Sequence, residues 1–135
     1  MFVYGTLRAG EANAGLLDGY VAERIPAALT DHDLHHLEHP CVTPSSRSRP
    51  ERRSRPVQGE LVVLGTGAYH DAIMNLDWLE SFDPADVAGS LYRRVAATAQ
   101  SRDGPVACWV YVAGDTLRAR LEPSNRIVSG DWLNP

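Results

Sequence analysis

Hydrophobic and polar positions along the 135-residue chain predict many short strands and one main helix. The strand segments are short runs rich in β-branched, aromatic and other apolar residues. In chain order we expect strands over 2–5, 21–30, 33–37, 57–64, 91–100, 105–113 and a short one near 126–132, with a helical turn near 11–18 and a helix over 67–81. Loops, rather than regular crossover helices, join most of these strands, which favours an α+β domain.

The predicted helix over 67–81 has recognisable start and stop signals. Thr66 is a plausible N-cap, and Asp83-Pro84 is a plausible stop. At about 100° per residue, one face of this helix is apolar and contains Tyr69, Ile73 and Leu76. Asp71 lies on the opposite face, where a solvated carboxylate belongs.

Glu80 is the exception on this helix, because it lies in the middle of the apolar face. Burying an unpaired charge there is costly. One interpretation is that Glu80 bends out to water in the last turn, or pairs with Arg93 or Arg94. The other is that Glu80 faces a pocket, where desolvation raises its pKa and prepares it for proton transfer.

The N-terminal segment Phe2-Val3-Tyr4-Gly5-Thr6-Leu7 predicts a strand that ends in a glycine-containing turn. Gly5 has no Cβ, so the main chain can turn sharply or approach a ligand closely at this position. Such a turn can present main-chain N–H groups to a carboxylate or phosphate. An ordinary strand end has the same sequence pattern, and the segment alone does not distinguish the two.

Several motifs, taken in order, resemble the γ-glutamylcyclotransferase-like (AIG2-like) family. The first three are Tyr4-Gly5-Thr6-Leu7, the helix end Leu76-Asp77-Trp78-Leu79-Glu80-Ser81-Phe82, and Leu91-Tyr92-Arg93-Arg94-Val95. The others are the region from Ala27 to Pro44, Val57-Gln58-Gly59-Glu60-Leu61, Cys108-Trp109-Val110-Tyr111-Val112 and Ile127-Val128-Ser129-Gly130-Asp131-Trp132. Ser81 is a departure, because the family often has glycine after the glutamate. The resemblance covers nearly the whole chain.

This resemblance implies a fold and a reaction. The implied fold is one domain over residues 1–135, a small mixed β-barrel-like sheet with flanking helices and a cavity at the strand ends. The implied reaction closes a γ-glutamyl compound on itself, which gives 5-oxoproline and a free amine. The attacking amine is already tethered to the carbonyl, so neither a protein nucleophile nor a metal or other cofactor is required.

The same resemblance assigns expected roles to particular residues. Glu80 would act as general acid and base. The N–H groups of Gly5, Thr6 and Leu7 would bind the α-carboxylate or the developing oxyanion. The tyrosines implied in the pocket are Tyr4 as a lining residue, and Tyr92 and Tyr111 as sources of a phenolic hydrogen bond. Arg93 and Arg94 alternate along a strand, so at most one of them faces the pocket.

Two other functions remain open for a member of this family. One is removal of a γ-glutamyl group from a larger biosynthetic intermediate. The other is binding of a small ligand or a partner in the same cavity, without catalysis.

Composition narrows the classes of function further. The chain is 44% hydrophobic, enough for one core, and no apolar run approaches the ~20 residues of a membrane span. A net charge of −4 argues against a general nucleic-acid binder. The N-terminus has no signal-peptide pattern, and Cys41 and Cys108 have neither zinc nor redox spacing, so we expect a reduced, cytoplasmic protein that is a monomer or weak homodimer.

Two biased segments have a simple and a sharper interpretation. The first segment contains four histidines, His32, His35, His36 and His39. In a helix, His32 and His36, or His35 and His39, would share a face and could bind a metal. The flanking residues favour strand and turn instead, so we expect no metal site. Residues 45–56 contain five arginines among serines and prolines. This composition is typical of a solvated loop, and the sharper alternative is an anion-binding lid near the pocket.

Overall fold

The computed structural model describes residues 1–45 and 55–135, and in this part of the chain it shows an α+β fold. The strands are β1 (Phe2–Val3), β2 (Val21–Leu29), β3 (His32–His36), β4 (Pro40–Pro44), β5 (Val57–Leu64), β6 (Tyr92–Ser101) and β7 (Gly104–Ala113). The α-helices are α1 (Tyr69–Leu79) and α2 (Asp115–Arg120), and the 3-10 helices are η1 (Ala14–Leu17) and η2 (Pro123–Asn125).

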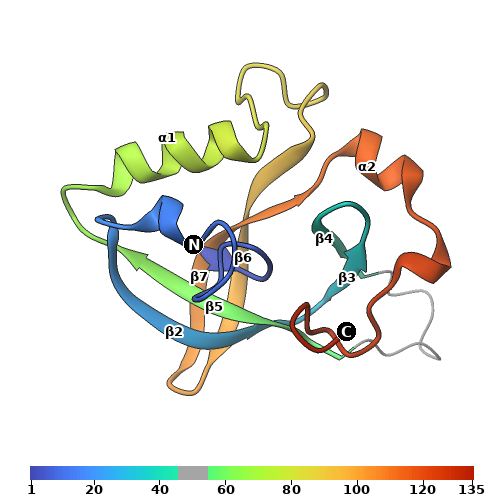
Figure 1. Cartoon of the computed structure of the whole chain (residues 1–135), viewed down its shortest axis with the longest axis horizontal. Coiled ribbons are helices and arrows are strands. Elements are labelled where there is room, and N and C mark those ends of the chain that lie inside the picture. The colour runs from blue at the N-terminus through green and yellow to red at the C-terminus, as the bar shows by residue number, and fades with distance from the viewer. Residues whose placement is uncertain (46–54) are drawn as a thin grey trace.

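A curled five-stranded sheet in the order β1-β5-β2-β6-β7 forms the frame of the structure (Figure 1). Every hydrogen-bonded pair of neighbouring strands is antiparallel. By alternation, the edge strands β1 and β7 therefore run in the same sense. They also lie close to each other, and the Tyr4 hydroxyl donates to the carbonyl oxygen of Tyr111 at 2.8 Å. The expected α+β class, with a barrel-like sheet and flanking helices, is confirmed.

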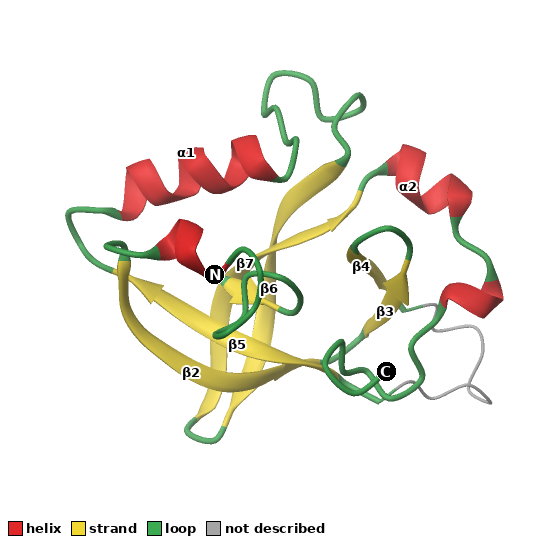
Figure 2. Ribbon diagram, in the orientation of Figure 1, coloured by secondary structure: helices red, strands yellow, loops and turns green. Residues whose placement is uncertain are grey.

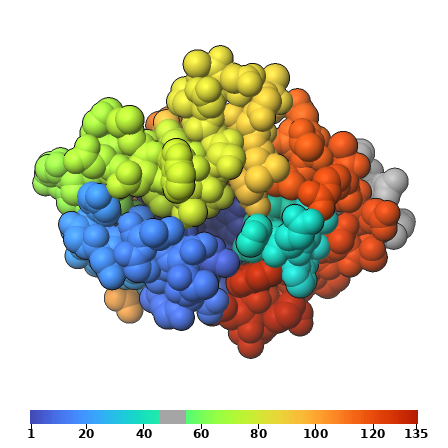
Figure 3. Space-filling model, turned by 45° about the horizontal axis from the view of Figure 1, so that its top comes forward, coloured from blue at the N-terminus to red at the C-terminus, as the bar shows by residue number. Residues whose placement is uncertain are grey.

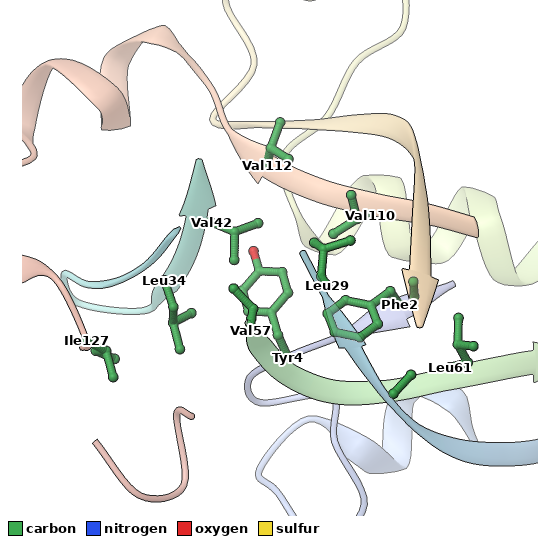
Figure 4. Close-up of a cluster of buried hydrophobic side chains, with 12 residues drawn as sticks. Phe2, Tyr4, Leu29, Leu34, Val42, Val57, Leu61, Val110, Val112 and Ile127 are labelled. Atoms are coloured by element: carbon green, nitrogen blue, oxygen red, sulfur yellow. The ribbon is translucent and has the colours of Figure 1, made fainter. Parts of the chain in front are cut away.

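The helices and the β3–β4 hairpin cover the sheet from different sides. Figure 2 shows α1 lying across one end, and the hairpin and α2 lying toward the other. The core has two parts. The larger one joins the sheet to the hairpin and includes Phe2, Tyr4, Leu29, Leu34, Val42, Val57, Leu61, Val110, Val112 and Ile127 (Figure 4). The second lies beneath α1 and includes Val3, Leu17, Val62, Leu76, Tyr92 and Tyr111.

Most predicted elements form within a few residues of their expected bounds, and the C-terminal strand near 126–132 is wrong. Arg126 forms only an isolated bridge with His35, and Ile127 donates its N–H to the carbonyl oxygen of Leu34. The chain then turns at Gly130, which has a φ of 73° that no regular strand allows. The strand β4 and the helix α2 are additional to the predicted list.

The predicted helix is shorter than expected at both ends. Ala68 stands at the N-cap without a side-chain cap, so Thr66 does not have that role. The helix ends at Leu79, several residues before Asp83-Pro84. Tyr69 was expected on the buried face, yet it is 47% exposed and its hydroxyl accepts a hydrogen bond from Trp109. No helix among the described residues is long and apolar enough to cross a membrane.

Gly59 on β5 allows β1 to lie close to the sheet. A Cβ at this position would lie 2.3 Å from the Val3 carbonyl oxygen and 2.7 Å from the Phe2 ring. Main-chain atoms of a paired strand cannot move away as the end of a flexible side chain can. Gly59 therefore fixes the position of β1, and with it the start of the loop that follows Tyr4.

We expect Gly59→Ala to destabilise the protein by about 2–3 kcal/mol, because overpacking at a buried contact forces the main chain apart. Urea denaturation measures the change in the free energy of unfolding. Gly67→Ala is the matched control, since nothing lies within 4 Å of its Cβ position and its φ is not positive. Equal stability of the two variants would contradict this account of Gly59.

Candidate active site

A cavity of about 230 Å³ opens between the end of α1, the loop after β1 and the β3–β4 turn. Figure 3 shows it as a hollow between the α1, N-terminal and β3–β4 segments, with the first residues of the chain at its floor. Its lining comes from β1, β4, β6, β7, α1 and three loops: Phe2, Val3, Tyr4, Gly5, Thr6, Leu7, Asn13, His39, Pro40, Leu79, Glu80, Leu91, Tyr92 and Tyr111.

The cavity brings together every site residue expected from the sequence, namely Tyr4, Gly5, Thr6, Leu7, Glu80, Tyr92 and Tyr111. Sequence reasoning did not assign Asn13, His39 or Pro40 to the site. Asn13 lies there because its side chain donates to the Thr6 hydroxyl at 2.9 Å. His39 and Pro40 reach the cavity through the β3–β4 turn, whose pairing no local motif indicates.

Glu80 follows directly after α1 and lies in the cavity wall as an unpaired carboxylate. The described residues provide no hydrogen bond or ion pair to its side chain, and desolvation by burial raises its pKa to about 7. Neither neighbouring arginine pairs with it. Arg93 is bonded to Asp115 at 2.6 Å, and Arg94 is bonded to Asp77 at 2.8 Å. Neither arginine lines the cavity.

The end of α1 has the hydrogen bonds of a Schellman motif, which sets the direction in which Glu80 leaves the helix. The N–H of Ser81 donates to the Trp78 carbonyl at 3.2 Å, and that of Phe82 to the Asp77 carbonyl at 2.8 Å. Ser81 has a φ of 52°, in the left-handed region where glycine is favoured. Ser81, which stands where the family often has glycine, therefore has a backbone conformation that glycine adopts more readily than serine.

The three tyrosines of the cavity all use their hydroxyl protons for internal hydrogen bonds. The hydroxyl of Tyr4 donates to the Tyr111 carbonyl, that of Tyr92 to the Pro40 carbonyl at 3.1 Å, and that of Tyr111 to the Asp77 carboxylate at 2.6 Å. Burial raises the pKa of each hydroxyl well above its usual range, and the hydrogen bond to Asp77 raises that of Tyr111 further. All three are therefore neutral at ordinary pH.

The loop from Gly5 to Ala9 is held by charged side chains behind the cavity. Glu60 accepts the Ala9 N–H at 2.7 Å, and Arg24 donates to the Leu7 carbonyl at 3.1 Å. The hydrogen bonds of the described residues include no acceptor for the N–H groups of Gly5, Thr6 or Leu7. These three N–H groups therefore belong to cavity-lining residues and have no hydrogen-bond acceptor among the described residues.

Comparison with known protein families identifies one family that matches this chain. Residues 1–134 match the model of the family described as gamma-glutamyl cyclotransferase, AIG2-like. The chain belongs to this family. A comparison of this chain with curated proteins found no match.

Solved structures show the same fold at low sequence identity. An AIG2-like protein from Mus musculus is 22% identical, with a TM-score of 0.63, and the match covers 93% of this chain and 80% of that chain. An uncharacterized protein from Pyrococcus horikoshii is 18% identical, with a TM-score of 0.61 and coverages of 98% and 87%. YkqA from Bacillus subtilis is 22% identical, with a TM-score of 0.66. The match covers 98% of this chain and 38% of YkqA.

The histidine-rich segment of this AIG2-like chain forms a strand and a turn, so the helix-face pairs do not arise. His32 contacts the Thr30 carbonyl at 2.8 Å, and His35 contacts the Thr43 hydroxyl at 2.9 Å. No group of three or more His, Cys, Asp or Glu side chains in the described ranges could hold a metal. Most of the arginine-rich segment, residues 46–54, lies outside the described residues.

We expect Ser81→Gly to stabilise the protein by about 1 kcal/mol, because glycine adopts a positive φ without the steric cost of a Cβ. The expected increase in melting temperature is about 3–5 °C. Calorimetry of the two proteins under the same conditions measures this change. A lower melting temperature for Ser81→Gly would show that the Ser81 side chain stabilises the helix end more than its φ destabilises it.

We also expect Glu80 to make stability depend on pH. The folded-state pKa of about 7 lies above the ordinary pKa of a glutamate side chain, 4.5, so the native state binds more protons than the unfolded chain between these values. Stability should therefore fall as pH rises through this range, by about 2–3 kcal/mol at most. Urea denaturation at pH 4.5 and 7.5 should show a smaller fall for Glu80→Gln, and parallel falls would contradict the assignment.

Proposed function

We propose that the chain is a γ-glutamylcyclotransferase-type enzyme that converts a γ-glutamyl compound into 5-oxoproline and a free amine. The observation that carries the proposal is Glu80, an unpaired carboxylate in a cavity wall with a pKa of about 7. A carboxyl group with this pKa can both accept and return a proton near neutral pH. Membership of the gamma-glutamyl cyclotransferase, AIG2-like family supports this class of reaction, and Glu80 in the cavity wall supports an acid and base role.

The glutamyl part of the substrate matches two kinds of group in the wall of this cavity. Its α-carboxylate is an anion, and the free N–H groups of Gly5, Thr6 and Leu7 are the main-chain donors in the wall. Its α-ammonium group is a cation that must lose a proton before it can attack. Glu80 is the ionisable carboxylate of the wall and takes that proton.

The reaction then proceeds within the substrate. The neutral α-amine attacks the γ-carbonyl carbon, the new C–N bond closes the five-membered ring, and the carbonyl oxygen becomes an oxyanion. Protonated Glu80 gives its proton to the leaving nitrogen and then takes the second proton from the ring nitrogen. The oxyanion re-forms the carbonyl as the bond to the leaving nitrogen breaks, and the amine departs. Holding the amine next to the carbonyl supplies much of the rate enhancement, since both groups belong to one molecule.

We expect Glu80→Gln to lower kcat by about 10²–10⁴-fold, because glutamine cannot transfer the proton. Purified protein is incubated with a panel of γ-glutamyl amino acids, γ-glutamyl amines and glutathione, and release of 5-oxoproline is measured. Glu23→Gln is the matched control, since it makes the same substitution at an exposed position on β2 away from the cavity. Wild-type kcat/KM should rise with pH around 7, as Glu80 becomes the free base.

The panel also separates this proposal from the other functions open to the family. Full activity of Glu80→Gln would exclude Glu80 as the acid and base. Binding of the panel compounds without release of 5-oxoproline would favour a non-catalytic binding protein. Absence of both binding and release would favour a larger γ-glutamyl intermediate as the substrate.

A further inference from the structure

Trp78 lies on the outer face of α1, and its side chain is the most exposed of the large apolar residues in the described ranges, at 85%. Met74 lies one turn earlier on the same face and is 58% exposed. The opposite face of the helix is buried through Ile73 and Leu76. The fold therefore leaves a tryptophan and a methionine side by side in solvent, and both residue types are enriched in protein interfaces.

The loop that follows α1 adds to this exposed apolar surface. Leu91 donates its N–H to the Ser81 carbonyl at 3.1 Å, and Asp83 donates its N–H to the Ser90 hydroxyl at 2.9 Å. These bonds hold the loop against the end of the helix, and Figure 3 shows the two segments next to each other on one face of the molecule. Val87 in this loop is 41% exposed. An exposed apolar side chain of the loop therefore lies near the last turn of α1.

The charges around this apolar surface are acidic. Residues 57–91 contain six Asp and Glu residues and no Lys or Arg. Asp71, Asp83 and Asp86 are exposed, and none of them forms an ion pair with a described residue. The carboxylates of Asp83 and Asp86 accept hydrogen bonds from main-chain N–H groups of their own loop, which leaves their charge uncompensated. The two arginines that follow on β6 are already ion-paired elsewhere.

This charge pattern determines what can cover the surface. Nucleic acids and anionic lipid surfaces are repelled by exposed carboxylates. A second copy related by a twofold axis would place the same acidic loop next to itself. A basic segment instead brings cations to the carboxylates, and its Lys or Arg side chains gain further energy by lying over the exposed tryptophan ring.

We propose that Met74, Trp78, Asp83, Asp86 and Val87 form a docking surface for a basic, apolar segment of a partner protein. In this segment Lys or Arg side chains flank aliphatic or aromatic ones. Tryptophan at the centre of an interface often contributes much of the binding energy, whereas charges at the rim set specificity and association rate. The inference does not depend on the reaction proposed above.

The first experiment selects peptides from a random library displayed on phage. The library is depleted on immobilised Trp78→Ala protein and is then selected on the wild type, so that the peptides retained need Trp78. We expect the enriched peptides to combine Lys or Arg with apolar residues. Enriched peptides that are acidic or neutral, or no enrichment on the wild type, would overturn the proposal.

An enriched peptide is then synthesised, and titration calorimetry measures its Kd. Trp78→Ala should weaken binding by about 30-fold, the loss typical of a central interface residue. Asp83→Asn combined with Asp86→Asn should weaken binding by about fivefold and reduce its dependence on salt, because two rim charges are removed. Asparagine keeps the side-chain oxygen that accepts each hydrogen bond of the loop, so the loop retains its structure.

Val106→Ala and Asp103→Asn are the matched controls. Val106 is 40% exposed and Asp103 is also exposed, and both lie at the end of the β6–β7 hairpin, far from α1 (Figure 1). Both variants should bind the peptide as the wild type does. Equal affinity of wild-type and Trp78→Ala protein for the peptide, or an equal loss in the controls, would overturn the proposal.

Two other results would assign this surface to a different occupant and so overturn the proposal. One is a wild-type dimer in analytical ultracentrifugation that Trp78→Ala abolishes, which would identify a second copy of the chain. The other is binding to phosphatidylglycerol vesicles that Trp78→Ala abolishes, which would identify a membrane. Release of 5-oxoproline is measured separately, so its result affects only the proposed function.

Discussion

The ion pair between Asp77 and Arg94 is the interaction on which the geometry of the cavity depends. Asp77 is only 8% exposed, and it joins the last turn of α1 to β6 through Arg94 and to β7 through Tyr111. The guanidinium of Arg94 also lies over the Trp109 ring, 4.8 Å from its centroid. Removing one partner of such a buried pair leaves an uncompensated charge. These contacts fix the helix end from which Glu80 extends.

A second group of charges holds the opposite wall. Arg8 is bonded to Asp131 at 2.8 Å, and Glu60 lies near both Arg8 and Arg24. These side chains satisfy the main chain of the loop at Leu7 and Ala9, on the side away from the cavity. The N–H groups of Gly5 and Thr6 have no acceptor among the described residues. Side chains from β2, β5 and the C-terminal segment therefore fix the conformation of this short loop.

The sequence predicted the parts of this arrangement that depend on local pattern. Glu80 stood out because a carboxylate in an apolar helical face is costly, and the structure shows it unpaired. The contributions of Asn13 and His39 could not be predicted, because tertiary pairing brings these loop positions to the cavity. Ile127 has the apolar character of a strand residue, but it does not belong to a strand. Its N–H donates to the Leu34 carbonyl, and the chain turns soon afterwards at Gly130.

Two carboxylates three residues apart at the end of α1 have different surroundings. Asp77 has an arginine and a phenol as partners, so its charge is compensated and it serves as a fixed acceptor. Glu80 lies beyond the last helical residue without such a partner, and desolvation alone brings its pKa into the neutral range. Environments that separate neighbouring carboxyl groups in this way divide structural from proton-transfer roles. The Schellman turn at Ser81 contributes to the difference, because the helix stops before Glu80 and the turn places the Phe82 ring, 5.6 Å from the Arg94 guanidinium, next to that arginine.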